Sequence, residues 1–417
     1  MEKKRFGFLI SILMIFSLVI GYLFYIEKVK IEEQKRKDES TVTIPKVSFW
    51  GDLSNISSKK EKRKIFVKYE SKDKKFESHA LIKWQGTSSL NYTKKNYTIS
   101  FYENDKYKQE NKIDVGLGGA QNIYCLKANW IDKTHARNIV TARIVSKIQD
   151  KYNLFEDTPN HGLINGFPVE IYLNGEFLGL YTWNIPKAAW MFNMDETNKN
   201  HIVFVGEKRS TTTFFKEEAT EYGNWELEVG TENEETLEKL NRLINFVNNS
   251  DNETFKNEFE KYLNLDATIN YLIMMELANM NDNFSKNMLL VTYDGKVWYP
   301  SLYDLDTTWG TRWDGKEKLD YYDFSYVTRS KLWERVIENY SYEVAERYFE
   351  LRKDILTKES IMKEFNDFYK SIPEETRIKE SERWENIPGY DYSQIEEFLD
   401  IRIPLMDQLM KDRLNQE

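Results

Sequence analysis

The sequence predicts an α+β protein with a β-rich first part and a mostly helical second part, and three observations support this. Between residues 46 and 230, apolar and polar residues alternate in short runs that are typical of strands. After residue 231, apolar residues recur at helical spacing, as in residues 234–248. An Asp-Gly turn at residues 294–295 predicts a hairpin among these helices. We therefore expect a β-rich lobe at residues 46–230, a helical lobe at residues 231–417, and a cleft between them.

Composition excludes several classes of function. The 417 residues carry a formal net charge of −9, which disfavours nucleic acid as the main partner because phosphate binding needs a basic surface. A single cysteine, Cys125, excludes an intramolecular disulfide framework and a thiolate zinc site. The 4 histidines are scattered, so a histidine metal site is not expected.

The amino terminus predicts a membrane anchor. Residues 1–5 include three basic side chains, and residues 6–26 form an uncharged apolar run. About 20 such residues suffice for a helix that crosses a bilayer, and the basic flank should stay in the cytoplasm. The alternative is a cleaved signal peptide, although the run is longer than the usual apolar region of one. The charged residues 27–45 should form a stalk, which places the body outside the cytoplasm.

Residues 46–102 are predicted to form strands, including residues 64–69 and 79–84. After a turn at residues 85–89, period two in residues 94–101 puts Lys95 on the apolar face with Tyr97. A lysine on such a face is costly unless it is paired or binds an anion. Lys95 is therefore either an anion ligand or a lysine whose ammonium extends to solvent.

A strand at residues 123–130 should lead into a helix that is capped by Asp132 or Thr134 and runs to about Lys151. Arg137 lies near the start of this helix and either faces solvent or takes part in a site. Further strands are expected at residues 169–173, 177–183, 202–205 and 225–229. Further helices are expected at residues 234–248, 255–263, 266–280, 330–340, 342–357, 359–371 and 392–411.

The hairpin inside the helical part carries the chemistry. Asp282 and Asn287, with four residues between them, precede a strand at residues 288–293, and a second strand at residues 296–299 leads to Asp304. The two ends of a hairpin meet at one edge, so these oxygen-bearing side chains should converge. Mg²⁺ prefers oxygen ligands, and protein kinases place an Asp, an Asn and a second Asp around such a hairpin. The alternative is that Asp and Asn simply favour turns.

Several blocks in order resemble the CotH kinase family, the spore-coat-associated atypical protein kinases. These blocks are residues 84–89 with 94–97, 132–138, 169–181, 281–287 and 303–310. The resemblance implies an atypical, two-lobed protein-kinase fold that uses ATP with Mg²⁺ or Mn²⁺. It also implies phosphate transfer to Ser or Thr of surface or spore-coat proteins, and a location at the cell surface or in the spore envelope.

Carried over by position, the resemblance implies a role for individual residues. Asp282 looks like the catalytic aspartate. The implied metal ligands are Asn287, Asp304 and Asp306, and the implied cofactor-binding residues are Gly86, Ser88, Lys95 and Arg137. The turn around Gly86 and Ser88 would replace a glycine-rich phosphate loop.

The chain also departs from the family pattern. Many members carry a Glu shortly after Gly-Leu-Tyr, where this chain has residues 183–187, and Tyr303 stands where a Trp is usual. The alternative reading is a catalytically inactive surface or coat protein that serves in assembly or binding. A third idea is carbohydrate binding by exposed aromatic residues, for which the candidates are Trp309, Trp313, Tyr321 and Tyr322.

Overall fold

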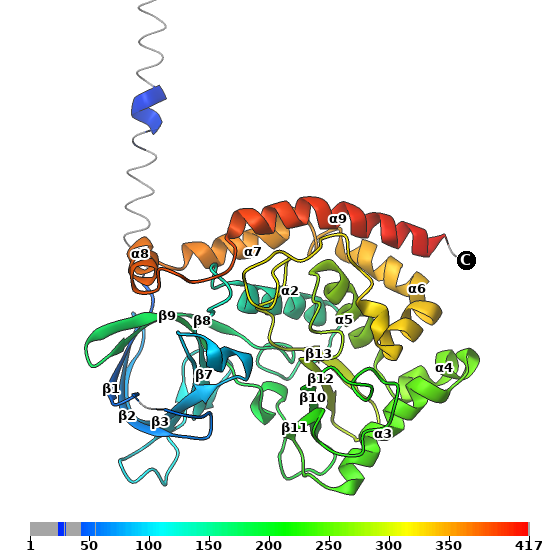
Figure 1. Cartoon of the computed structure of the whole chain (residues 1–417), viewed down its shortest axis with the longest axis horizontal. Helices are drawn as coiled ribbons and strands as arrows, with labels where there is room; N and C mark the ends of the chain where they lie inside the picture. The colour runs from blue at the N-terminus through cyan, green and yellow to red at the C-terminus, as the bar shows by residue number, and fades with distance from the viewer. Residues whose placement is uncertain (1–23, 29, 31–42, 55, 416–417) are drawn as a thin grey trace, which may run out of the picture.

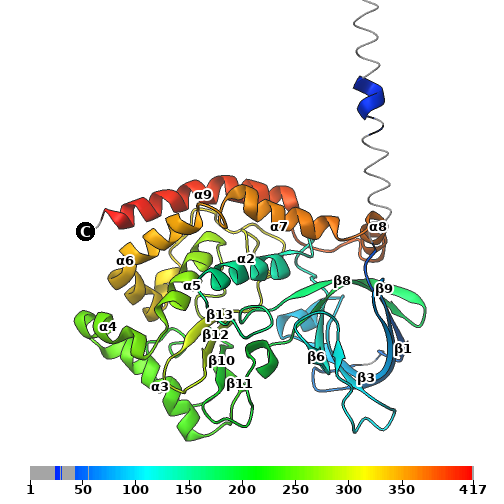
Figure 2. The ribbon, with the colours of Figure 1, turned by 180° about the vertical axis from the view of Figure 1, so that it is seen from behind.

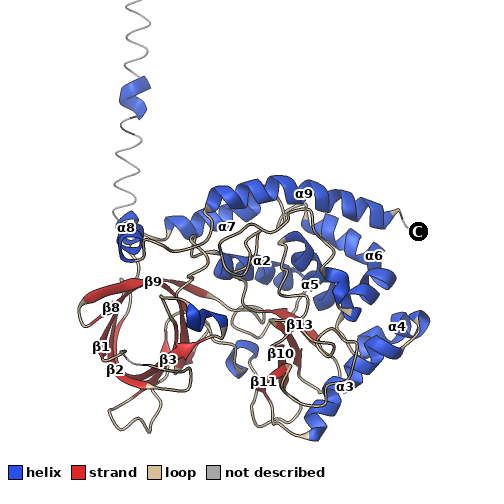
Figure 3. Ribbon diagram, viewed as in Figure 1, coloured by secondary structure: helices blue, strands red, loops and turns tan. Residues whose placement is uncertain are grey.

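The computed structural model describes residues 24–28, 30, 43–54 and 56–415. Of the predicted membrane segment at residues 6–26, only the last three residues are among these, and most of the predicted stalk also lies outside them. Within the described ranges, no helix has the length and apolar character needed to cross a membrane. The predicted α+β class, β-rich first and helical second, is confirmed (Figures 1 and 3).

A closed barrel of seven strands forms the first body. Its strands, in order around the barrel, are β1 (Lys46–Gly51), β2 (Arg63–Glu70), β3 (Lys75–Gln85), β4 (Asn96–Tyr102), β7 (Ile123–Lys127), β9 (Glu176–Asn184) and β8 (Gly166–Leu173). Neighbouring strands are antiparallel except β1 and β8, which pair in parallel and close the barrel. Alternate residues such as Ile65, Ile82 and Ile99 are buried and fill the interior. The opposite row of each strand therefore faces outward.

The hairpin of β8 and β9 follows the prediction closely. Asn174 and Gly175 at its turn have φ angles of 51° and 88°, the left-handed pair that an Asn-Gly turn favours. Both strands are longer than predicted, because β8 begins at Gly166 and β9 ends at Asn184. A small separate sheet pairs β5 (Ile113–Asp114) with β6 (Ala120–Gln121).

The second sheet has four antiparallel strands in the order β11 (Trp225–Val229), β10 (Ile202–Gly206), β12 (Met288–Thr292) and β13 (Tyr299–Leu302). Strands β10 and β11, which precede the expected lobe boundary at residue 230, thus belong to the sheet that carries the central hairpin. The prediction of a second strand at residues 296–299 was wrong. Asp294 Oδ1 accepts the N–H groups of Lys296 (2.8 Å) and Val297 (2.9 Å), which makes a longer turn, and β13 starts only at Tyr299.

After β7, eight helices of the described chain pack on the second sheet or on one another, except one that packs on the barrel. They are α2 (Arg137–Lys151), α3 (Glu234–Asn249), α4 (Asn252–Glu258), α5 (Leu265–Leu277), α6 (Lys331–Leu351), α7 (Lys358–Lys370), α8 (Glu374–Arg383) and α9 (Tyr392–Leu414). Short 3₁₀ turns are η1 (Ser88–Asn91), η2 (Ala189–Phe192), η3 (Phe259–Lys261) and η4 (Val327–Arg329). Helix α5 packs against β13, and α2 packs against α5 and α7 (Figure 2).

Local signals explain most helix boundaries. The side chains of Asn233, Asp251, Asn264, Thr357 and Asp391 each accept a backbone N–H and cap α3, α4, α5, α7 and α9. Two helices predicted on either side of residue 341 form one helix, α6, with a non-helical residue at Tyr340.

Helix α8 leaves the helical body and packs on the barrel strand β9 (Figure 1). Its Glu380 accepts hydrogen bonds from the ammonium of Lys94 and from the N–H of Leu180, both at 2.6 Å. Trp384, which follows α8, donates its indole N–H to the carbonyl of Leu178 at 3.1 Å. Helix α8 and Trp384 therefore tie the barrel to the C-terminal helices.

Candidate active site

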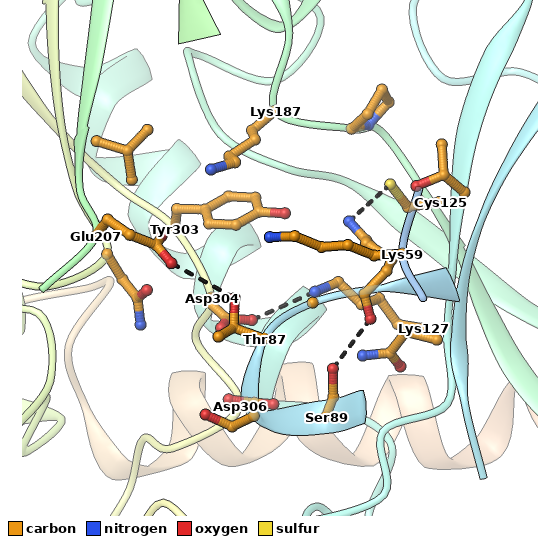
Figure 4. A pocket seen from close by; sticks show the side chains of 18 of the residues that line it. Lys59, Thr87, Ser89, Cys125, Lys127, Lys187, Glu207, Tyr303, Asp304 and Asp306 are labelled. Carbon is orange, nitrogen blue, oxygen red and sulfur yellow. Dashed lines mark hydrogen bonds and ion pairs between the residues drawn. The ribbon is translucent and has the colours of Figure 1, made fainter. Parts of the chain in front are cut away.

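A cavity of about 780 Å³ lies between the outer face of the barrel and the second sheet (Figure 4). Its barrel wall includes Lys83, Thr98 and Cys125, which stand opposite one another on β3, β4 and β7. Its other wall comes from the loops next to β10, β12 and β13. Because apolar residues fill the inside of the barrel, the outward row of these strands is free to face a ligand.

Both acidic loops predicted from the sequence open into this cavity. Asp282 and Asn287 lie in the loop between α5 and β12, and Asp304 and Asp306 follow β13. Between the two loops, the side-chain amide of Asn283 donates a hydrogen bond to the carbonyl of Tyr303 at 2.8 Å. The structure therefore brings together the aspartates and the asparagine that the hairpin argument placed at one edge.

The backbone is strained at two of these positions. Asn287 and Asp304 have φ angles of 62° and 56°, which side chains other than glycine rarely adopt. Their loops are held by hydrogen bonds from Asn287 N–H to the carbonyl of Gly206 (2.8 Å) and from Leu305 N–H to Oδ1 of Asn138 (3.1 Å). Strain of this kind costs about 1–3 kcal/mol and is concentrated at functional sites.

The acidic groups affect one another electrostatically. Burial raises the pKa of Asp306, and the nearby carboxylates of Asp304, Asp132 and Asp282 raise it further, while Lys127 opposes them. Asp282 also forms an ion pair with Arg209, whose guanidinium donates in addition to the carbonyl of Asn281 at 2.8 Å. The carboxyl groups of the two acidic loops thus lie close enough to repel one another, and a cation bound among them would relieve this repulsion, although other parts of the cavity wall carry basic side chains.

Two lysines in the cavity were missed by the sequence reasoning. Lys127 Nζ lies 3.3 Å from Oδ1 of Asp304, and Lys187 Nζ lies 2.5 Å and 2.8 Å from carboxylate oxygens of Glu226 and Glu228. Burial disfavours the charged form of Lys127, but Tyr303 and the aspartates outweigh it and raise the pKa of Lys127. The glutamates and Tyr303 raise the pKa of Lys187 in the same way. Both lysines therefore stay charged.

The signal for Lys127 was present in the sequence. It shares the outward row of β7 with Cys125, two residues earlier. Lys187 lies in the segment after β9 in which the chain departs from the family pattern, and no local pattern marks it as a cavity residue.

Two predicted cofactor-binding residues lie elsewhere. Lys95 is not part of the cavity wall, and its ammonium bonds instead to the carbonyls of Leu90 (2.7 Å) and Tyr92. Arg137 is fully buried at the start of α2, where it pairs with Asp132 and donates to Gln394 at 2.6 Å. Neither residue lines this cavity.

The other two predicted cofactor-binding residues do line the cavity. Gly86 and Ser88 line the cavity in the turn after β3, and Gly86 has a φ of 100°, which suits glycine. Next to them, the hydroxyl of Thr87 donates to a carboxylate oxygen of Glu207 across the cavity at 3.4 Å (Figure 4). This turn therefore covers one side of the cavity.

The aromatic residues considered for carbohydrate binding do not form one surface. Trp309 and Tyr321 are buried, and Trp309 donates its indole N–H to the hydroxyl of Thr141 at 2.8 Å. Trp313 and Tyr322 are exposed, and Trp313 stands at the cavity wall. Core packing accounts for two of the four residues.

The donor set suits a divalent cation that keeps several outer ligands. In the part of the chain that the structure describes, no three His, Cys, Asp or Glu side chains are grouped closely enough to enclose a metal ion. Asn287, Asp304 and Asp306 nevertheless offer oxygen atoms, and the buried hydroxyl of Thr307 beside them has no hydrogen-bond partner there. Mg²⁺ takes few protein oxygens and completes its shell with water and phosphate, which fits these residues.

Comparisons with known proteins agree with the resemblance of the motifs. No curated protein matches the chain. Residues 82–403, most of the chain, match the family described as CotH kinase protein. This range contains both acidic loops of the cavity. The chain therefore belongs to the CotH kinase family.

Proposed function

We propose that this protein is a kinase that transfers the γ-phosphate of ATP to Ser or Thr hydroxyls of surface or spore-coat proteins. The observation that carries the proposal is the convergence of Asp282, Asn287 and Asp304 on one cavity that also contains the charged side chain of Lys127. The barrel and the helical body on either side of this cavity would be the two lobes of a kinase-like fold.

Each cavity residue has a role that its chemistry supports. Asp282 would accept the proton of the substrate hydroxyl, as the catalytic-loop aspartate of protein kinases does. Asn287, Asp304 and Asp306 would hold Mg²⁺ or Mn²⁺, which supplies the positive charge that phosphoryl transfer requires. Lys127, rather than Lys95, would contact the phosphates, because its ammonium lies beside Asp304 inside the cavity. The turn at Gly86 and Ser88 would cover the nucleotide.

A transfer assay tests the proposal. The purified full chain is incubated with radiolabelled ATP, Mg²⁺ and a spore-coat or cell-surface extract, and labelled protein is measured. We expect Asp282→Asn and Asp304→Asn to abolish labelling, whereas Asp73→Asn, at an exposed barrel loop, should leave it unchanged. Equal labelling by wild type and both site variants would refute the assignment.

The alternative is a catalytically inactive member of the family that serves in surface or coat assembly. The ion pair of Asp282 with Arg209 favours it, because the guanidinium already occupies a carboxylate oxygen that would have to accept the proton of the substrate hydroxyl. If the protein is instead an active enzyme that Arg209 restrains, Arg209→Ala should raise the transfer rate. An inactive chain that also shows no thermal stabilisation by Mg·ATP would support the assembly role.

We also propose that the body is held outside the cytoplasm by the apolar segment at residues 6–26, with the spore envelope as the alternative location. The basic residues 1–5 and the length of the apolar run support this orientation. Protease added to intact cells should digest the body, and a body that stays protected would contradict the proposal.

A further inference from the structure

Tyr303 has a ring whose position in the cavity is fixed from several directions. The ammonium nitrogens of Lys127 and Lys187 lie 5.6 Å and 5.5 Å from the centroid of its ring. Its carbonyl accepts the hydrogen bond from Asn283 at 2.8 Å, and only 8% of the residue is exposed. The ring therefore has little freedom to move.

The hydroxyl of Tyr303 is the part that faces the cavity. Figure 4 shows it pointing away from its own loop, toward the barrel side. It has no hydrogen-bond partner among the described residues, although the residue lines the cavity wall. The hydroxyl oxygen is not among the fully enclosed unpaired polar atoms of the described residues, so it is open to the cavity and available to a molecule that enters it.

The surroundings indicate the charge of that molecule. A phenol hydroxyl can donate or accept, and two ammonium groups beside the ring favour an anionic oxygen nearby. The ammonium of Lys187 is already balanced by Glu226 and Glu228, whereas Lys127 contacts only Asp304 among these carboxylates. An anion would thus meet Lys127 and the free hydroxyl together.

We propose that the hydroxyl of Tyr303 donates a hydrogen bond to a phosphoryl oxygen of the ligand, so that Tyr303 and Lys127 together recognise a polyphosphate chain. The inference rests on the proposed function, because it names a further residue that positions the nucleotide of that reaction. No proton is transferred, and the hydroxyl acts only as a donor.

The test compares the wild-type full chain with Tyr303→Phe, which keeps the ring and removes the hydroxyl. Tyr92→Phe is the matched control, because Tyr92 lines the same cavity but donates its hydroxyl to the carbonyl of Trp313 at 3.4 Å. Binding of Mg·ATP and of inorganic tripolyphosphate with Mg²⁺ is measured by thermal shift and calorimetry. The KM for ATP and kcat are measured separately.

We expect Tyr303→Phe to weaken both ligands by about tenfold or more, as for the loss of a hydrogen bond to a charged group. KM should rise while kcat and the unfolding temperature without ligand stay close to wild type. Equal affinity of Tyr303→Phe and wild type, or an equal loss in Tyr92→Phe, would overturn the inference. Poly-glutamate serves as a carboxylate probe in the same assay. If Tyr303→Phe weakens the binding of poly-glutamate but not of tripolyphosphate, the anion is a carboxylate and the inference is overturned.

The same measurements separate this inference from the proposed function. A wild-type chain that binds tripolyphosphate through Tyr303 but transfers no phosphate supports the inference and refutes the kinase. A chain that transfers phosphate with the same KM in wild type and Tyr303→Phe supports the kinase and refutes the inference.

Discussion

The buried ion pair of Lys94 and Glu380 provides a quantitative test of how the barrel is held to helix α8. The side chain of Lys94 is 0% exposed and that of Glu380 is 5% exposed, and their charged atoms are 2.6 Å apart. The three protons of the Lys94 ammonium are all used, because Nζ also bonds to the carbonyls of Leu180 (2.5 Å) and Ala128 (3.1 Å). Burial lowers the pKa of Lys94 and Glu380 opposes this, so the lysine depends on its partner to stay charged.

Lys94→Met removes one charge and leaves the Glu380 carboxylate buried. Breaking a buried pair in this way costs about 3–5 kcal/mol, and the two carbonyls that lose a donor place the expected loss near the middle of that range. Urea unfolding measures it as a lower midpoint at an unchanged slope. In the double variant Lys94→Met/Glu380→Leu, the loss should be at least about 2 kcal/mol smaller than the sum of the single losses.

A matched control uses the exposed pair of Lys363 and Asp367 on α7, whose side chains are 71% and 52% exposed. Lys363→Met should not change the urea midpoint measurably, because solvent screens such a pair. A loss of less than about 1 kcal/mol in Lys94→Met, or additive losses in the double variant, would refute the reasoning.

Three further predictions concern the site and its support. Lys127→Met should weaken Mg·ATP binding about tenfold or more in calorimetry, since a charge-assisted contact is lost. Burial and Asp304 raise the pKa of Asp306 from 3.8 to about 8. Between these two pH values the folded protein holds a proton that the unfolded chain releases, so the free energy of unfolding falls as the pH rises. Urea unfolding at pH 5 and pH 9 should show this fall in wild type and a smaller fall in Asp306→Asn. Gly179→Ala should lower the unfolding temperature, because Gly179 has a φ of 153° and an added Cβ would lie 2.8 Å from Cε of Lys94.

The elements that the sequence predicted well are those set by neighbouring residues. The Asn-Gly turn, the helix caps and the period of α3 depend on contacts within a few positions, so they can be read without knowing the fold. The convergence of Asp282, Asn287 and Asp304 followed from one hairpin for the same reason, although the hairpin has a longer turn than predicted.

The features that the sequence did not reveal depend on distant partners. The parallel pairing of β1 with β8 closes the barrel across more than a hundred residues, and no local pattern specifies it. Helix α8 was missed because its buried residues are Thr376 and Glu380, which give no apolar stripe. The alternation that placed Lys95 on the apolar face does not reach it, because β4 starts only at Asn96, and the lysine that is buried is its neighbour Lys94, which pairs with Glu380 of α8.

The outward row of the barrel gives a last prediction that separates the cavity from the barrel core. Thr98 stands between Lys83 and Cys125 on this row and lines the cavity, while Ser100 is two residues further along the same face and lies outside it. Because neither side chain fills the barrel interior, a larger residue at either position should leave the fold intact. Thr98→Trp should therefore abolish the stabilisation by Mg·ATP in a thermal-shift titration, and Ser100→Trp should preserve it. Loss of the response in both variants, or in neither, would mean that the ligand does not occupy the space against β3, β4 and β7.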